Sequence, residues 1–95
     1  MDLRTRIEEK LKQVIDPETS MDVMRMQLVK NLLVDENGAV SLIFFPSSPT
    51  CPLAFQLALS IQDAVKKVKG VTEIKINVEG YIRAEELENI LADNG

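Results

Sequence analysis

The sequence contains no histidine and no tryptophan, one cysteine, and few aromatic residues of any kind. Without histidine the chain lacks the usual general base, the usual zinc ligand, and the base of any Cys-His or Ser-His couple. A single cysteine cannot form an internal disulfide, and it is typical of a reducing compartment in which the thiol stays free. These absences argue against most hydrolytic enzymes and against a disulfide-stabilised secreted domain.

Positive charge is also scarce, because 11 Lys and Arg residues face 15 Asp and Glu residues and leave a net charge of −4. Nucleic-acid binding depends on clustered cations, whereas Lys66, Lys67 and Lys69 fall at the expected end of a helix and complement its dipole. No apolar run reaches membrane-spanning length, and the N-terminus does not resemble a signal segment. We therefore expect a cytoplasmic protein that binds neither nucleic acid nor membrane.

The chain that remains has an ordinary globular composition, with 95 residues of which 45% are hydrophobic and 27% charged. This length fits one domain, residues 1–95. The four glycines are scattered, so no phosphate-binding loop is present. A core of this size gains stability from apolar surface shared with another chain, so association with a second copy or with a client protein is expected.

Hydrophobic periodicity predicts a helix followed by a β-hairpin in the first half of the chain. Leu3, Ile7 and Leu11 lie at helical spacing, and Pro17 ends this helix near Ile15. Two apolar runs, 27–34 and 39–45, flank an Asn-Gly pair that supplies the positive φ angles of a tight turn. We therefore expect an amphipathic helix, an Asp-Pro turn and two antiparallel strands.

The second half predicts a proline-rich loop, a helix over 52–68, a strand over 71–78 and a helix over 84–91. The strand alternates cleanly, which predicts one buried and one wet sheet face. The order helix-strand-strand-helix-strand-helix indicates an α+β fold, a two-layer sandwich with helices on one face of a small mixed sheet.

Cys51 is the residue with the most chemical interest. It directly precedes Pro52, which fits the first position of the long helix, while Ser48 and Thr50 are candidate capping residues. The positive end of the helix dipole favours a thiolate, which is both a nucleophile and a ligand for soft metals. A free cysteine also commonly fills space in a core, so position alone leaves an inert role open.

Two motifs carry a resemblance to a known family. Val14-Ile15-Asp16-Pro17-Glu18 follows the first helix, and Ser47-Ser48-Pro49-Thr50-Cys51-Pro52-Leu53 precedes the second. Together, over roughly residues 5 to 80, they resemble the MIP18 or DUF59 family, which includes SufT-like and PaaD-like proteins. The sequence departs from the family at Gln27, where many members have glycine, and in its C-terminal segment, which lacks the tryptophan found in many members.

The resemblance implies a role in assembling or delivering iron–sulfur clusters, without catalysis in the usual sense, and an iron–sulfur assembly type of fold. One thiolate cannot hold a cluster, which typically has four cysteine-type ligands. A transient cluster or iron bound by Cys51 is therefore shared with a second subunit, a scaffold or a client protein. Asp16 and Glu18 are further candidate metal ligands. The alternative is that Asp-Pro-Glu only forms the turn at the end of the helix.

Two other functions stay open at this stage. One is a thiol oxidoreductase that uses Cys51 alone and therefore needs an external thiol to turn over. The other is a protein interaction module with an inert cysteine.

Helix-terminal placement predicts that Cys51 is accessible and that the pKa of its thiol lies below the ordinary value. Iodoacetamide labelling across a pH series measures this, with the expected midpoint below about 8.5, the free-cysteine value. A midpoint at or above that value would contradict the predicted stabilisation of the thiolate.

Overall fold

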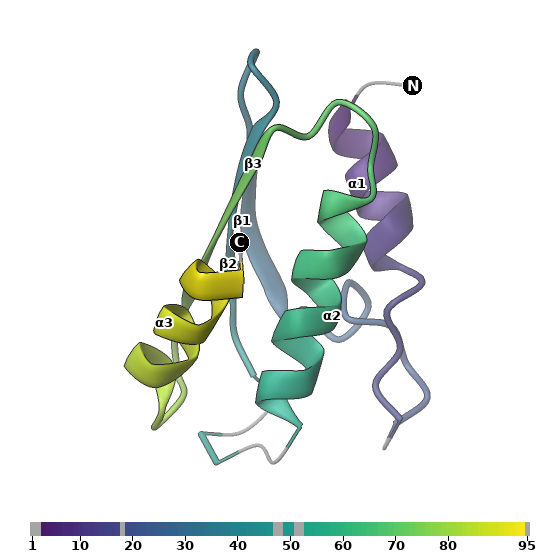
Figure 1. Ribbon diagram of the computed structural model, residues 1–95. Helices are drawn as coiled ribbons and strands as arrows, with labels where there is room; N and C mark the ends of the chain where they lie inside the picture. Colours follow the sequence, from purple (N-terminus) through teal and green to yellow (C-terminus); the bar gives the residue numbers. More distant parts are fainter. Residues whose placement is uncertain (1–2, 18, 47–48, 51–52, 95) are drawn as a thin grey trace.

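Three helices and three strands follow one another in the predicted order (Figure 1). The computed structural model describes residues 3–17, 19–46, 49–50 and 53–94. The elements are α1 (Leu3–Leu11), β1 (Val29–Val34), β2 (Ala39–Phe44), α2 (Ala54–Lys66), β3 (Glu73–Val78) and α3 (Ala84–Asn94). The predicted α+β class and element order are confirmed.

The strands form one mixed sheet in the order β1-β2-β3. β1 and β2 are antiparallel and joined by the predicted turn, in which the Asp35 carboxylate accepts hydrogen bonds from the backbone N–H groups of Asn37 and Ala39 at 2.8 and 2.9 Å. β2 and β3 are parallel, with Ala39 opposite Glu73 and Phe44 opposite Val78. Because parallel strands cannot be joined by a tight turn, α2 forms the crossover between them.

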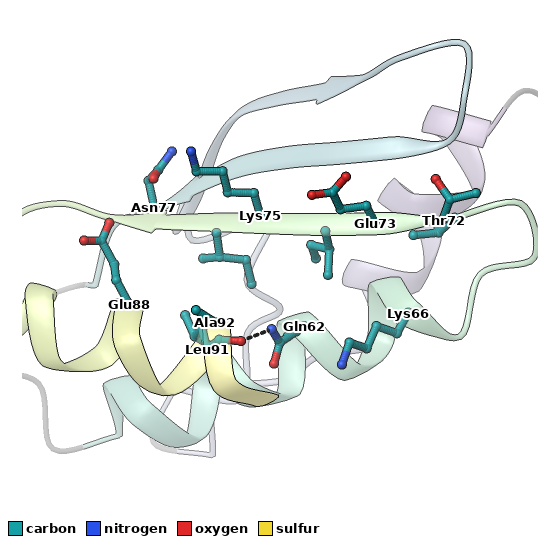
Figure 2. Close-up of a pocket in the computed structure, with 12 residues that line it drawn as sticks. Gln62, Lys66, Thr72, Glu73, Lys75, Asn77, Glu88, Leu91 and Ala92 are labelled. Carbon is teal, nitrogen blue, oxygen red and sulfur yellow. Dashed lines mark hydrogen bonds between the residues drawn. The ribbon is translucent and has the colours of Figure 1, made fainter. Parts of the chain in front are cut away.

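The helices bury one face of this sheet. α2 packs on α1 and on β3, and α1 also contacts β1. α3 packs on β3 and on α2 (Figures 1 and 2). Among the described residues the buried apolar side chains form one cluster, namely Ile7, Leu11, Val23, Leu28, Val29, Leu32, Val40, Leu42, Phe44, Ala54, Leu57, Ala58, Ile61, Val65, Val68, Ile76, Val78, Leu87 and Leu91. On β3 the alternation is as predicted, with Ile76 and Val78 inside and Glu73 and Lys75 exposed.

The first strand is shorter and less regular than predicted. It begins at Val29, and its register shifts between Lys30 and Leu33, where Asn31 has a φ of 51°. This β-bulge turns Leu32 inward and leaves Leu33 64% exposed, because one extra residue reverses the faces of the strand. Gln27 precedes the strand with a φ of 61°, a left-handed conformation that glycine adopts at no steric cost.

The first helix ends at Leu11, earlier than the predicted end near Ile15. The N–H groups of Gln13 and Val14 donate to carbonyls three residues back, at 3.0 Å each, so the last turn tightens and the helix stops. Ile15 then forms an isolated antiparallel bridge with Asp22. Its side chain therefore leaves the helical stripe and is 48% exposed.

The later boundaries differ by two or three residues from the predicted ones. α2 begins after Leu53, whose φ of −99° and ψ of 4° are not helical. β3 begins only at Glu73, because the N–H of Thr72 donates to the carbonyl of Gly38 at 3.0 Å at the end of the ladder. α3 continues to Asn94 instead of ending at Leu91.

Replacement of Gly38 by alanine is expected to destabilise the fold by about 2–4 kcal/mol. Gly38 has a φ of 88°, and an added Cβ would collide with the backbone carbonyl of Gly70. Gly70→Ala is the matched control, since its φ of 106° brings similar strain but its Cβ would meet only Leu3 Cδ1 at 3.4 Å. Urea unfolding of both variants measures the difference, and equal losses of about 1 kcal/mol would show that the collision has no cost.

Candidate functional site

The candidate site lies where the parallel strands β2 and β3 end. Phe44 and Val78 are opposite each other at the last step of the ladder. From Phe45 the chain passes through the proline-rich loop into α2, and the start of α3 lies at the same end of the molecule (Figure 1). In open sheets of parallel strands, ligands bind at the carboxyl ends. The crossover from β2 to α2, whose sequence contains the predicted cysteine motif, thus begins at this end of the sheet.

Backbone hydrogen bonds anchor the described parts of this loop. The N–H of Phe45 donates to the carbonyl of Leu28 at 2.7 Å, and Pro46 is buried behind it. Further along, the carbonyl of Pro49 accepts from the N–H of Ile82 at 2.9 Å. This second bond ties the loop to the segment between β3 and α3. The described parts of the loop are therefore held from two different parts of the chain.

The start of α2 supplies the electrostatics of the site. Leu53 is the N-cap residue, and its carbonyl accepts the first helical hydrogen bond from the N–H of Leu57 at 2.8 Å. The first N–H groups of any helix have no partner within the helix, so this end carries partial positive charge. Cys51 stands three residues before Ala54 in the sequence. The helix end thus attracts negative charge close to the cysteine motif.

Four of the predicted site residues, namely Glu18, Ser48, Cys51 and Pro52, lie outside the described residues. Thr50 is described and exposed. The capping predicted for Ser48 and Thr50 and the metal ligation predicted for Cys51 and Glu18 therefore stay predictions.

Asp16 is described, and its surroundings are those of a tight turn. Its side chain is 3% exposed. Its backbone N–H donates to the carbonyl of Met21 at 2.9 Å, and its carbonyl accepts from the N–H of Ser20 at 2.8 Å. The Asp-Pro turn lies at the same end of the molecule as the start of α2 (Figure 1). Burial of this carboxylate favours a structural role over ligation of iron arriving from solvent.

An aromatic and cationic cluster lies beside the loop, and sequence reasoning missed it. The Phe55 ring meets the Tyr81 ring edge-on, with centroids 6.1 Å apart, and the Arg83 guanidinium stands 4.7 Å above the Phe55 ring. Next to them Ile82 is 74% exposed. Only the placement of Phe55 beside the apolar stripe of α2 hinted at this surface, since its two partners lie more than 25 residues away in the sequence.

A charge pair fixes the Arg83 side chain. Its Nε and Nη2 atoms donate to the two carboxylate oxygens of Glu86 at 2.8 and 2.6 Å. The hydrogen bond and the charge of Arg83 hold the pKa of Glu86 below its usual value, against a smaller opposing effect of desolvation. The same hydrogen bond raises the pKa of Arg83. The pair is exposed, so it orients the guanidinium over Phe55 more than it stabilises the fold.

The described residues offer neither a metal-binding cluster nor a membrane-spanning helix. Among them no group of three or more His, Cys, Asp or Glu side chains is placed to hold a metal ion. Within the same ranges no helix is long and apolar enough to cross a membrane.

The mixed sheet and the α2 crossover define a class of small α+β domains. It is the class of fold that the resemblance to the MIP18 or DUF59 family implied. A solved structure of a DUF59 domain from Bacillus anthracis has this fold, with a TM-score of 0.74 at 25% identity, covering 97% of this chain and 90% of that one. The model of the iron-sulfur cluster assembly protein family matches residues 4–77. The chain belongs to this family.

Curated relatives agree with this membership. The chain is 29% identical over 83 residues to protein MJ1129 of Methanocaldococcus jannaschii, covering 87% of each chain. It is 28% identical over 76 residues to the Fe-S protein maturation auxiliary factor YitW of Bacillus subtilis, covering 80% of this chain and 74% of that one. The predicted resemblance to the MIP18 or DUF59 family, with its SufT-like members, is thereby confirmed.

Removal of the Arg83 charge by Arg83→Gln is expected to raise the pKa of Glu86 towards its ordinary value of 4.5. Because the folded pKa is lowered, the ionic part of the pair's stabilisation is present above the unfolded carboxyl pKa. It is lost as the pH falls through the lower folded pKa. NMR titration of Glu86 in both proteins measures the shift. The difference in stability between the original protein and the variant should be smaller at pH 2 than at pH 7. A difference that does not depend on pH would show that the Arg83–Glu86 ion pair does not stabilise the fold.

Proposed function

We propose that this protein is an iron–sulfur cluster assembly or delivery factor that acts as a carrier or adaptor through the thiolate of Cys51. The observation that carries the proposal is the family match over residues 4–77, which includes both the Asp-Pro-Glu turn and the cysteine motif. The name of YitW, a maturation auxiliary factor, supports the same class of function. The protein is then a non-enzymatic member of a maturation pathway in a reducing, cytoplasmic setting.

The chemistry follows from the start of α2. A thiolate is the form of cysteine that binds iron, and the positive end of a helix favours the thiolate over the thiol. A single thiolate provides one of the four ligands that a cluster typically needs. The other ligands therefore come from the client protein, the scaffold or a second copy of the chain. Such incomplete ligation suits a carrier, because a cluster held by few bonds is readily passed on.

The exposed surface beside the loop suits contact with a client. Ile82 and the Phe55–Tyr81 pair present apolar area, and the adjacent Arg83 supplies charge. Aromatic residues and arginine are the side chains most enriched at the centres of protein interfaces. A client that docks here would bring its own cluster ligands to the end of the sheet where the cysteine motif lies.

Replacement of Cys51 by alanine is expected to abolish cluster delivery and to change the free energy of unfolding by no more than about 0.5 kcal/mol, the usual range for exposed sites. Anaerobic reconstitution with iron and sulfide, followed by transfer to an apo-client, measures delivery by absorption spectra and client activity. Urea midpoints measure stability in parallel. Ser60→Ala, an exposed change on α2, is the control and should leave both quantities unchanged.

Each alternative function gives a different result in this experiment. A loss of stability above about 1 kcal/mol with delivery intact would indicate a cysteine that only fills space, and the proposal would be wrong. Turnover of disulfide substrates with an external thiol, without any iron-dependent absorption, would indicate a thiol oxidoreductase. Iron-dependent absorption that requires the apo-client would identify the client as the source of the missing ligands.

A further inference from the structure

A groove of about 550 Å³ runs along the free edge of β3, the strand at one end of the sheet (Figure 2). β3 forms one wall of it. Gln62 and Lys66 of α2 and Glu88, Leu91 and Ala92 of α3 form the other. An edge strand that borders an open groove is a geometry in which another strand can be added to a sheet.

Backbone groups of β3 alternate between its two edges. The N–H of Glu79 donates to a carbonyl of β2 at 3.1 Å, so the odd-numbered residues of β3 direct their N–H and C=O groups towards β2. Ile74, Ile76 and Val78 therefore direct theirs towards the groove. The N–H of Val78 is already used, because it donates to the Glu88 carboxylate at 2.9 Å. The backbone groups of Ile74 and Ile76 thus form the open part of the edge.

We infer that a second copy of this chain pairs with this edge, β3 against β3 in the antiparallel direction, with the two Ile74 residues opposite each other. Each Ile74 then exchanges both of its backbone hydrogen bonds with the other. The pairing joins two three-stranded sheets into one continuous sheet. It is independent of the proposed function, since it involves no residue of the cysteine motif.

Charge complementarity selects the second copy and its register. Glu73 and Lys75 are exposed on the outer face, on either side of Ile74. Pairing centred on Ile74 places Glu73 of each copy opposite Lys75 of the other, which gives two favourable cross-strand pairs. Pairing centred on Lys75 would place two lysines directly opposite each other. Pairing centred on Ile76 would place Glu73 of each copy opposite Glu79 of the other, which are like charges.

This register also determines where the two candidate sites lie. Val78 of one copy is opposite residue 70 of the other, so the two Val78 residues are about 27 Å apart at the usual rise of a strand. The cysteine motif of each copy follows the strand that ends beside its own Val78. The two motifs therefore lie at opposite ends of the joined sheet. A cluster bound by one copy is then shared with a client and not with the second copy.

Charge exchange between Glu73 and Lys75 tests the pairing. Sedimentation equilibrium over a concentration series should show the average mass rising from 10.6 kDa towards twice that value. Lys75→Glu or Glu73→Lys alone places like charges opposite each other and should raise the dissociation constant at least about tenfold. The double variant, with both charges exchanged, restores the pairs and should return the constant to within about threefold of the original.

Two control variants make the same charge changes away from the groove. Lys12→Glu and Glu36→Lys alter exposed residues near the end of α1 and in the β1–β2 turn, and they should leave the dissociation constant unchanged. Cys51→Ala should dimerise like the original protein, which separates failure of this proposal from failure of the proposed function. Circular dichroism spectra confirm that each variant is folded.

Amide exchange provides a second measurement. Exchange at Ile74 should slow as the protein concentration rises, since its N–H becomes bonded in the dimer. A mass of 10.6 kDa at every concentration would overturn the proposal. So would a dimer whose dissociation constant changes in neither single variant. Protection of Ile74 by an extended client peptide, in a chain that stays monomeric, would also overturn it and would make a client strand the occupant.

Discussion

Burial of α2 against the parallel strands β2 and β3 is the constraint on which the rest of the structure depends. Parallel strands need a long crossover, and this crossover must cover the sheet with an apolar face. Ala54 and Ala58 are fully buried, and their small side chains let the helix approach the strands closely. Phe44 is the largest of the fully buried side chains in this core. Without this packing the parallel pair would not have a defined position.

The same packing determines what α3 does. α3 lies on the part of β3 and α2 that remains open, with Leu87 and Leu91 in the core. The buried Gln62 amide of α2 donates to the carbonyl of Leu91 at 2.8 Å, which joins the two helices. From this position Glu88 reaches the N–H of Val78. α3 thus occupies the backbone N–H at the carboxyl end of the β3 edge and leaves the backbone groups of Ile74 and Ile76 available.

Two separate surfaces result, and we assign a different partner to each. The carboxyl end of β2 leads into the sequence of the cysteine motif, and the Phe55–Tyr81–Arg83 cluster lies at the same end of the sheet. We propose that a client brings further ligands there. The edge of β3 carries backbone groups and the complementary charges of Glu73 and Lys75, which suit a second copy. Because the surfaces do not overlap, a dimer leaves both copies of the loop accessible. A carrier that meets many clients benefits from this separation.

Much of this architecture could be predicted from local chemistry. The Asn-Gly turn, the alternation on β3 and the apolar stripe of α2 each follow from neighbouring residues, so the class, the order and the family were predictable. The irregular features were not. The bulge at Asn31 and the early end of α1 before Ile15 differ from the periodic pattern because contacts elsewhere in the chain determine them.

The candidate site also has features that follow from the sequence and features that do not. The sequence by itself determined that Cys51 precedes a helix start, because Pro52 and the apolar stripe after it are local signals. The position of Arg83 over Phe55 and the capping of Val78 by Glu88 were decided only by the tertiary structure. Phe55 and Arg83 lie on different elements, and they meet only when α2 and α3 pack on the same sheet. Long-range packing creates such contacts, and no local pattern encodes them.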